Sequence, residues 1–428
     1  MKLTKHFPLS LCILHCAFCI AASAHGTQVT KVLVRQQWPW SAKVVVDYTL
    51  ADTDGRTVDV APSFTLNGQP FAVPDEALSG DIEDVAAGER RIVFDPSLAT
   101  VPDGFKTGEI AVSLAVTTNK WLVIDLSGGP TAESYPAVFV GRPVDGWTDN
   151  AYKTSKLVMR RIPAGTFVQG NPGNTNEATL SKDYFIAVHE MTRGQYARIT
   201  GTNVVDSAIS DDTEETFPGR TSWQELRGTA KGSRWPWAPS GGKASAVDPG
   251  TFMDVLRSKV SLPTEITEKG YVFDLPTEAQ WEFACRAGTT NEWNNGTNMS
   301  LHPHPSHSDW SVDDNLALLG WYRWNTDNNK KFRKVGLKLP NAWGLYDMHG
   351  NAPESCLNRF GVLNGKASEG TDPKGAGSPD NATYWVFRAR RGGGVDYPAA
   401  DCRSGSRERS GSLTTTLLGI RLALHDEQ

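Results

Sequence analysis

Two short stretches, TRGQYARITG and LPTEAQWEFACRAG, carry the clearest helix signals between residues 155 and 426. In each, a threonine stands three residues before a glutamine, which is the spacing of a capping box. Much of the remaining sequence is polar and rich in glycine and proline, which favours irregular loops. Loops of this length need something to hold them, such as aromatic clusters or a bound metal. The region is therefore predicted to be α+β, with little regular secondary structure.

The sequence before residue 126 is typical of β-strands. SAKVVVDYTL is rich in β-branched residues, and FTLNGQPF contains Asn67-Gly68, the strongest short signal for a hairpin. Short strands at this spacing predict an all-β, sandwich-like domain over residues 25–126. Residues 127–154, rich in Gly, Pro and Ser, are expected to form a connector. Residues 155–426 then form a second domain.

The first 24 residues have the features of a secretory signal peptide. Lys2 and Lys5 precede the apolar run FPLSLCILHCAFCIA, and Ala22-Ser23-Ala24 provides small residues before a cleavage site. We expect a soluble protein that is exported to the periplasm or the extracellular space. The apolar run is too short to span a membrane, and no later stretch is long enough.

Charge and cysteine content narrow the possible functions further. The formal net charge is −5, which argues against a nucleic-acid partner because such partners require a basic face. The chain expected after cleavage keeps Cys285, Cys356 and Cys402. An odd number leaves at least one thiol without a disulfide partner, unless it bonds another chain or a metal. Cys285 shares a helical face with Trp281 and is expected to be a buried core thiol, whereas the pairing of Cys356 and Cys402 stays open.

Five motifs in order resemble those of the formylglycine-generating enzyme family, also called the sulfatase-modifying factor domain. The resemblance covers about Lys156 to Leu424 and implies a C-type-lectin-like fold. The motifs are IPAGTFVQGN, HEMTRGQY, LPTEAQWEFACRAGTT, PNAWGLYDMHGNAPE, and RRGGGVDYPAADCRS followed by LLGIRLAL.

The resemblance implies an activity that this sequence matches only in part. Founding members of the family oxidise a sulfatase cysteine, in a C-x-P-x-R motif, to formylglycine with oxygen and a copper(I) ion held by two cysteines. Cys402 falls at the second of these positions, but Tyr397 stands at the first, and tyrosine is a poor ligand for copper(I). The candidate catalytic residues are therefore Cys402, also the candidate copper ligand, with Tyr397 and Arg407. Neighbouring arginines would lower the pKa of Cys402 if they pointed at it; otherwise they are ion-paired structural residues.

The stretch LYDMHGNAPE suggests a calcium site. Asp347 and Glu354 flank a tight Gly-Asn turn that exposes backbone carbonyls, and such hard oxygen ligands suit Ca²⁺. The resemblance implies a structural calcium site made by the Asp347 side chain, the carbonyls of Gly350 and Ala352, and the Glu354 carboxylate. The alternative is an ordinary polar turn. In the same loop Pro353 and Ser355 replace two aromatic residues, which changes the floor of the expected peptide groove.

Two classes of function remain open on these observations. The first is an exported oxidase that acts on a cysteine of a sulfatase or another exported protein or peptide. The second is a non-catalytic binding protein on the same scaffold, which presents loops to a glycan, a peptide or a protein partner. Whether the chain is an enzyme is uncertain, because only one of the two expected active-site cysteines is present.

Overall fold

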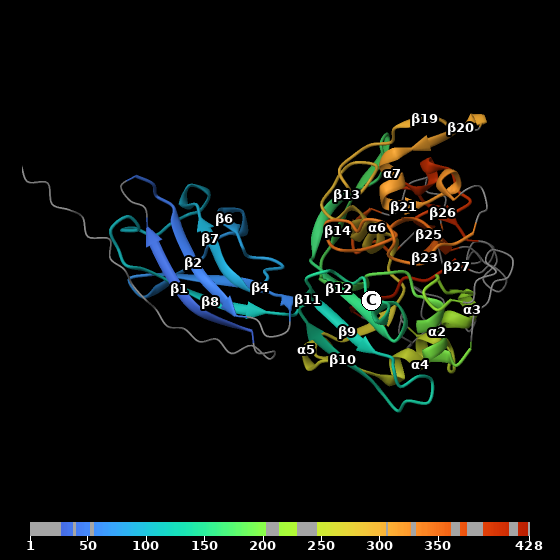
Figure 1. Ribbon diagram of the computed structural model, residues 1–428, viewed down its shortest axis with the longest axis horizontal. Coiled ribbons are helices and arrows are strands. Elements are labelled where there is room, and N and C mark those ends of the chain that lie inside the picture. The colour runs from blue at the N-terminus through green and yellow to red at the C-terminus, as the bar shows by residue number, and fades with distance from the viewer. Residues whose placement is uncertain are drawn as a thin grey trace, which may run out of the picture. The chain divides into compact units, whose positions relative to one another are not determined.

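The computed structural model of the protein describes most of the chain in two compact units. The first unit extends to Lys120 and includes Val140–Gly146, and the second consists of Trp121–Phe139 and the chain from Trp147 onwards. The predicted signal peptide, residues 1–24, lies outside the described residues. Those residues are 27–36, 40–51, 55–202, 214–228, 246–304, 307–326, 331–360, 369–374, 388–410 and 418–426 (Figure 1). No helix among them is long and apolar enough to cross a membrane.

The first unit is built from antiparallel sheets around one apolar core. Its four-stranded sheet has the order β1-β2-β7-β6 and its three-stranded sheet the order β5-β4-β8, and β11 pairs with β3. Valines, phenylalanines and Tyr48 from both sheets form a single buried cluster. The strands are β1 (Gln28–Gln36), β2 (Val44–Ala51), β3 (Arg56–Thr57), β4 (Asp59–Leu66), β5 (Gln69–Phe71), β6 (Leu78–Gly80), β7 (Gly88–Phe94), β8 (Ile110–Thr117) and β11 (Arg142–Pro143).

The predicted hairpin turn at Asn67-Gly68 is confirmed. Strands β4 and β5 pair with Leu66 opposite Gln69, so only Asn67 and Gly68 lie between the paired residues and form the turn. Both have positive φ, 49° at Asn67 and 77° at Gly68, and such backbone angles favour Asn and Gly over other residues. The turn fixes the register of the sheet that follows.

A seven-stranded sheet forms the base of the second unit. Its order is β17-β10-β9-β12-β15-β28-β18, so the last strand of the described chain lies between β15 and β18. Apolar residues of these strands pack with those of α2, α3 and α4 in one large core. The strands are β9 (Trp121–Asp125), β10 (Tyr135–Val140), β12 (Lys156–Ile162), β15 (Tyr184–Ala187), β17 (Val260–Ser261), β18 (Tyr271–Asp274) and β28 (Ala423–Asp426).

Smaller sheets and short helices complete the second unit. One sheet has the order β16-β27-β23-β25-β26, another β13-β14-β24, and two are single pairs, β19-β20 and β21-β22. Their strands are β13 (Gly165–Asn171), β14 (Asn174–Leu180), β16 (Arg220–Thr221), β19 (Leu301–His304), β20 (His307–Asp313), β21 (Gly320–Trp321), β22 (His349–Gly350), β23 (Glu354–Arg359), β24 (Gly370–Thr371), β25 (Arg388–Arg391), β26 (Glu408–Arg409) and β27 (Leu418–Gly419). The helices are α1 (Ala151–Thr154), α2 (Arg193–Thr200), α3 (Trp223–Arg227), α4 (Phe252–Lys259), α5 (Thr264–Thr267), α6 (Glu278–Arg286) and α7 (Asp314–Leu319).

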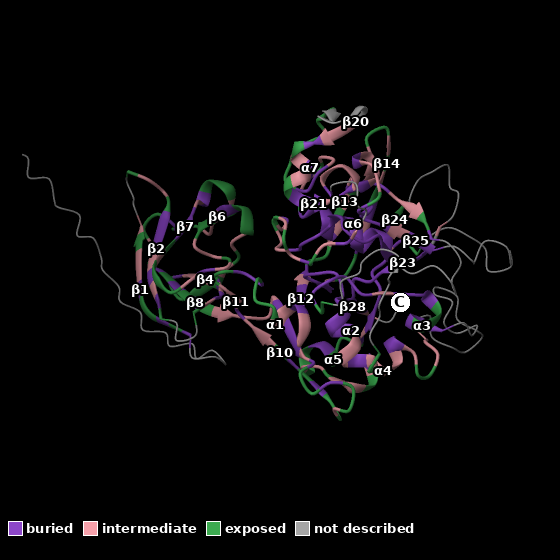
Figure 2. Ribbon diagram, turned by 45° about the vertical axis from the view of Figure 1, so that its right-hand side comes forward, coloured by how far each residue is buried: buried purple, intermediate pink, exposed green. Residues whose placement is uncertain are grey.

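Both predicted capping boxes are present. Thr192 caps α2 together with Gln195, and Thr277 caps α6 together with Gln280. Helix α6 is buried on almost every side (Figure 2), including its charged residues. Burying a charged side chain costs free energy unless the charge is paired, so the charged residues of α6 are expected to have ion-pair partners.

The fold contains both helices and strands and is mostly sheet, in agreement with the predicted α+β class. The division between the units differs from the predicted one at residue 126. Strand β9 and the supposed connector strand β10 belong to the seven-stranded sheet of the second unit, and the Tyr135 side chain of β10 is completely buried there. Glycine and proline flank β10, and they hid its alternating burial in the sequence.

Candidate functional site

The glycine-rich turn before Cys402 brings the backbone against the thiol. Gly392 and Gly393 have φ values of 88° and 68°, a region that favours glycine. A Cβ atom added to Gly393 would lie 2.5 Å from the Cys402 Sγ atom and 3.0 Å from the Asp401 carbonyl oxygen. The turn is thus shaped to cover this sulfur.

Cys402 is buried in an apolar cluster. Its exposed fraction is 0%, and it packs with Trp293, Leu316, Tyr322 and other apolar residues. Burial raises the pKa of the Cys402 thiol far above its ordinary value, and the nearby carboxylates of Asp401 and Glu408 raise it further. The thiol is therefore covered, and its surroundings favour the protonated form.

The arginines that follow Cys402 do not activate it. Arg403 donates to a Glu292 oxygen at 3.0 Å, and Arg407 donates to both oxygens of Glu278 at 2.9 and 2.8 Å. The condition under which neighbouring arginines would lower the pKa of Cys402 is not met by Arg403 and Arg407, because both are paired with these acids. The alternative, that they are ion-paired structural residues, describes Arg403 and Arg407.

Tyr397 packs at the edge of the same cluster, with Arg390 over its ring. Burial raises the pKa of its hydroxyl, so it carries no phenolate charge at neutral pH. All three cysteines that the structure describes are free and buried. Neither Cys285 nor Cys356 belongs to the cluster around Cys402.

Helix α6 carries a buried ion network behind the Cys402 loop. Arg391 of β25 donates to Glu282 at 2.9 Å and lies 3.3 Å from Glu278. Glu282 accepts from Arg286 at 2.7 Å and also from the backbone N–H of Gly170 at 2.7 Å. The network therefore ties α6 to β25 and to the end of β13, and its charges are paired as buried charges must be.

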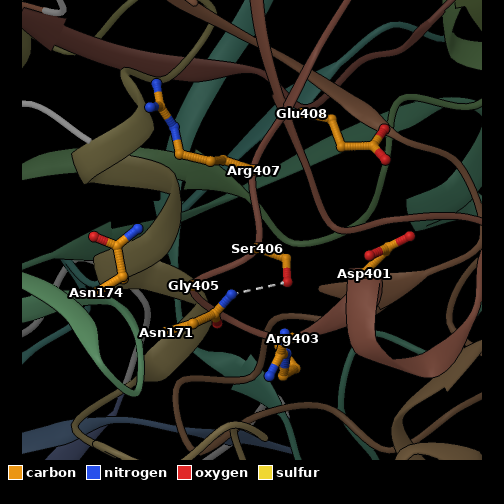
Figure 3. Close-up of a pocket in the computed structure, with 9 residues that line it drawn as sticks. Asn171, Asn174, Asp401, Arg403, Gly405, Ser406, Arg407 and Glu408 are labelled. Carbon is orange, nitrogen blue, oxygen red and sulfur yellow. Dashed lines mark hydrogen bonds between the residues drawn. The ribbon is translucent and has the colours of Figure 1, made fainter. Parts of the chain in front are cut away.

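A polar cavity opens where this network meets the surface. It has a volume of about 210 Å³ and lies between the β13–β14 turn and the loop after Cys402 (Figure 3). Residues on both sides approach closely, since a Cβ atom added to Gly405 would lie 2.3 Å from the Gly170 carbonyl carbon. The lining residues are Gly170, Asn171, Asn174, Asp401, Arg403, Gly405, Ser406, Arg407 and Glu408.

The predicted calcium loop has an unusual backbone. Asp347, Gly350 and Asn351 all have positive φ, between 54° and 83°. A Cβ atom on Gly350 would lie 2.1 Å from the Trp321 carbonyl oxygen, so only glycine fits there. One Asp347 oxygen, Oδ2, accepts from the Gly336 N–H at 2.6 Å. The other, Oδ1, is buried and has no hydrogen-bond partner among the described residues.

The remaining predicted calcium ligands fit less well. Both oxygens of Glu354 accept hydrogen bonds from the Arg421 guanidinium, and Trp281 donates to the same carboxylate. This carboxylate is therefore already saturated, whereas Asp347 Oδ1 has a spare lone pair for a cation. Burial raises the pKa of Asp347 to about 6. A bound cation would remove the cost of keeping this carboxylate charged.

Two residues in this region were not singled out in the sequence. Glu190 is completely buried, and its carboxylate accepts from the Ala352 N–H at 2.8 Å and from the Asn351 amide at 2.6 Å. His349 accepts from the Asn294 N–H at 3.2 Å and donates from Nδ1 to the Cys402 carbonyl oxygen at 2.7 Å. Glu190 lies in the HEMTRGQY motif, two residues before the helix cap Thr192. This position in the motif is the sequence signal that could have identified Glu190 as a residue of the loop. Among the described residues, no group of three His, Cys, Asp or Glu side chains is placed to hold a metal.

Comparison with known proteins places the second unit in a family. A family model described as "Sulfatase-modifying factor enzyme 1-like domain" matches residues 148–425. The chain belongs to this family. The match confirms the predicted resemblance to the sulfatase-modifying factor domain and starts a few residues before Lys156, where the resemblance was expected to begin.

Two proteins whose sequences are similar to this chain have different names. The chain is 23% identical over 244 residues to "Chaperone protein LppX" of Paenibacillus barcinonensis. This alignment covers 55% of this chain and 80% of that protein. It is 24% identical over 245 residues to the formylglycine-generating enzyme of Bos taurus, covering 51% of this chain and 62% of the bovine protein.

Solved structures also resemble the chain. Treponema denticola variable protein 1 is 23% identical with a TM-score of 0.43, and the match covers 63% of this chain and 95% of that one. PvdO from Pseudomonas aeruginosa is 21% identical with a TM-score of 0.38, covering 63% and 94%.

Proposed function

We propose that this protein is an exported, non-catalytic binding member of the sulfatase-modifying factor family. On a C-type-lectin-like scaffold, it presents the loops of the second unit to a glycan, a peptide or a protein partner. The observation that carries the proposal is the complete burial of Cys402 beneath Gly393 and the Trp293 cluster. A nucleophilic or copper-binding thiol must be ionised and reachable, and the burial of Cys402 opposes both.

The donor set supports the same reading. Copper(I) prefers soft sulfur ligands, and a site that oxidises a thiol in this family requires two of them. Tyr397 occupies the other position with an oxygen atom whose proton burial retains. The residues around Cys402 therefore do not fit a two-thiolate copper(I) centre, and we derive no step through one.

The names of the two relatives do not decide between the classes of function. One is named as a chaperone, which is a binding role, and the other as an enzyme. The proposal therefore rests on the site, because function depends on residues rather than on fold.

The oxidase class is tested directly with a peptide substrate. The purified protein is loaded with copper(I) and incubated in air with a peptide that contains a C-x-P-x-R motif, and thiol-to-aldehyde conversion is followed by mass spectrometry. A formylglycine-generating enzyme treated in parallel is the positive control. We expect no conversion. Conversion that Cys402→Ser abolishes would overturn the proposal and show that Cys402 is catalytic.

Thiol accessibility provides a second test. We expect iodoacetamide to leave Cys402 unmodified in the folded protein and to modify it fully in urea. Rapid modification of the folded protein at neutral pH would show an exposed thiolate and contradict the proposal.

We further propose a structural calcium ion at the loop Asp347–Glu354, held by the Asp347 side chain with the carbonyls of Gly350 and Ala352. The unpartnered, buried Oδ1 atom of Asp347 supports the site. The saturated Glu354 carboxylate makes a smaller contribution than the resemblance implies, because Arg421 already neutralises it.

A further inference from the structure

We propose that the polar cavity beside Cys402 binds a neutral, polyhydroxylated ligand, namely a sugar unit, through the Asp401 carboxylate and the amide of Asn171. This inference rests on the proposed binding function and specifies its ligand class. Figure 3 shows these side chains around the cavity together with Ser406.

The cavity walls are fixed before any ligand arrives. Gly170 is held on one side by Glu282, which accepts its N–H, and by Arg286, which donates to its carbonyl at 2.7 Å. On the opposite wall Arg391 donates to the Ser406 carbonyl at 3.3 Å, from the same buried network. A ligand therefore meets a preorganised surface and loses little free energy in ordering it.

The charges on the walls disfavour a charged ligand. Arg403, Arg407 and Glu408 each have an ion-pair partner, respectively Glu292, Glu278 and Arg390. A cationic ligand would lie beside two guanidinium groups, and an anionic ligand would lie beside two carboxylates. A neutral ligand avoids both repulsions.

Asp401 is the exception among the charged lining residues. Its carboxylate has neither an ion-pair partner nor a hydrogen-bond donor within the described part of the chain, and its residue is half-buried. A carboxylate has two acceptor oxygens side by side, which suit two neighbouring hydroxyl groups. Hydrogen bonds to a charged acceptor are also the stronger kind.

The other lining groups supply the matching donors and acceptors. Asn171 donates from Nδ2 to the Ser406 hydroxyl at 3.3 Å, and its second amide hydrogen and its side-chain carbonyl oxygen have no hydrogen-bond partner among the described residues. Ser406 in turn donates to the Ala400 carbonyl at 2.8 Å, so its hydroxyl is held in place. Because a sugar hydroxyl both donates and accepts, alternating amide and carboxylate groups are complementary to a polyol.

The size of the cavity limits the ligand further. Pockets for drug-sized ligands usually have volumes of about 300–1,000 Å³. A volume of about 210 Å³ suits one small group, such as a single sugar ring, and leaves the rest of a longer glycan in solvent.

The test is saturation-transfer NMR on the full chain with methyl α-glucoside, methyl α-mannoside, methyl β-galactoside and N-acetylglucosamine as probes. We expect at least one of them to bind with a Kd of about 1 mM, which is typical of a weak single-ring ligand. Asp401→Asn should weaken that binding about tenfold or more, since it removes a charged acceptor. Glu268→Gln, a change at an exposed position in the same unit, should leave it unchanged.

Asn171→Ala provides a second variant, at a position outside the Cys402 loop, and it should weaken the same probe. Absence of binding for all four sugars overturns the inference, as does Asp401-dependent binding of argininamide or of sulfate instead. Retention on dextran or chitin beads, compared with binding of the free sugar, distinguishes a polymeric from a soluble source. Peptide oxidation is measured separately, so failure of the proposed function and failure of this ligand class are distinguishable.

Discussion

Gly393 illustrates how closely single residues are fitted around Cys402. Its positive φ and the adjacent sulfur both exclude a side chain, whereas Gly270 has the same φ of 68° with nothing within 4 Å of its added Cβ atom. Substitution of Gly270 therefore tests backbone strain alone, whereas substitution of Gly393 tests backbone strain together with steric overlap. Backbone strain alone is worth about 1–2 kcal/mol for an alanine.

We therefore expect Gly393→Ala to lower the free energy of unfolding by about 3 kcal/mol or more, because overlap in a packed core adds to strain. Gly270→Ala should cost about 1–2 kcal/mol. Urea unfolding followed by tryptophan fluorescence measures both values. Equal losses in the two variants would mean that the covering of Cys402 relaxes easily.

For single residues, the sequence predicted which residue types are present near Cys402 but not which groups their side chains contact. The position of Cys402 and the absence of a second cysteine could be read directly from the motif. Burial of the thiol could not, because the covering residues Trp293 and Tyr322 lie about 110 and 80 positions earlier in the chain. The ion pairs of Arg403 and Arg407 depend on acids of similarly distant segments, so their effect on the thiol could not be predicted either.

Among the elements, the junction of β12, β15 and β18 depends on one carboxylate. Asp183, just before β15, accepts hydrogen bonds from Arg161 of β12, from Lys269 and from Tyr271 of β18. Partial burial by itself would raise the pKa of Asp183, but these hydrogen bonds and the charge of Arg161 bring it below its ordinary value of 3.8. The carboxylate therefore stabilises the fold in its charged form.

Asp183→Asn should reduce the stability by about 1 kcal/mol at pH 7, a value that allows for solvent screening of a partly exposed group. Because the folded pKa lies below the unfolded one, this stabilisation is present above about pH 4 and is lost as the pH falls through the folded pKa. The difference between wild type and variant in urea unfolding should thus shrink from pH 6 towards pH 3. A difference that is constant with pH would contradict the linkage.

The proposed calcium site at the loop Asp347–Glu354 gives a second prediction for an element. At a calcium concentration about 100 times Kd, binding to the folded state contributes about 2.7 kcal/mol. For a domain of this size we expect calcium to raise the Tm by about 5 °C over EDTA-treated protein. Asp347→Ala should lower the Tm in EDTA but remove most of the calcium-dependent increase, as measured by calorimetry. If EDTA and calcium give the same Tm in the wild type, the site does not exist.

The secondary structure could be predicted where its signal is local. Both capping boxes and the Asn67-Gly68 turn depend on neighbouring residues, and the structure contains all three. Strands β9 and β10 could not be assigned to the right sheet, because their partners β12 and β17 lie further along the chain. The pattern of apolar and polar residues within one strand does not show which distant strand it pairs with.

For the whole molecule, the matched family region and the folded unit do not coincide. The family match starts at residue 148, but β9 pairs with β12 over five residue pairs and lies inside the seven-stranded sheet. Leu122, Ile124 and Tyr135, all before residue 148, are completely buried in the core of that sheet.

A fragment of residues 148–428 should therefore be much less stable than one of residues 121–428. Each large apolar side chain contributes about 1.5–3 kcal/mol when buried, so the three together approach the total stability of a typical domain. We expect the shorter fragment to aggregate or to lack a cooperative thermal transition, and the longer one to unfold cooperatively. Equal Tm values for the two fragments would show that the sheet does not need β9 and β10.

The path of the chain between the two units also bears on how such a protein can diversify by gene rearrangement. The chain enters the second unit at Trp121, returns to the first for Val140–Gly146, where β11 pairs with β3, and enters the second again at Trp147. A single crossover anywhere between these points separates paired strands in one unit or the other. An exchange that gives this sulfatase-modifying factor domain a new N-terminal partner must therefore break before Trp121 and replace the short returning segment as well.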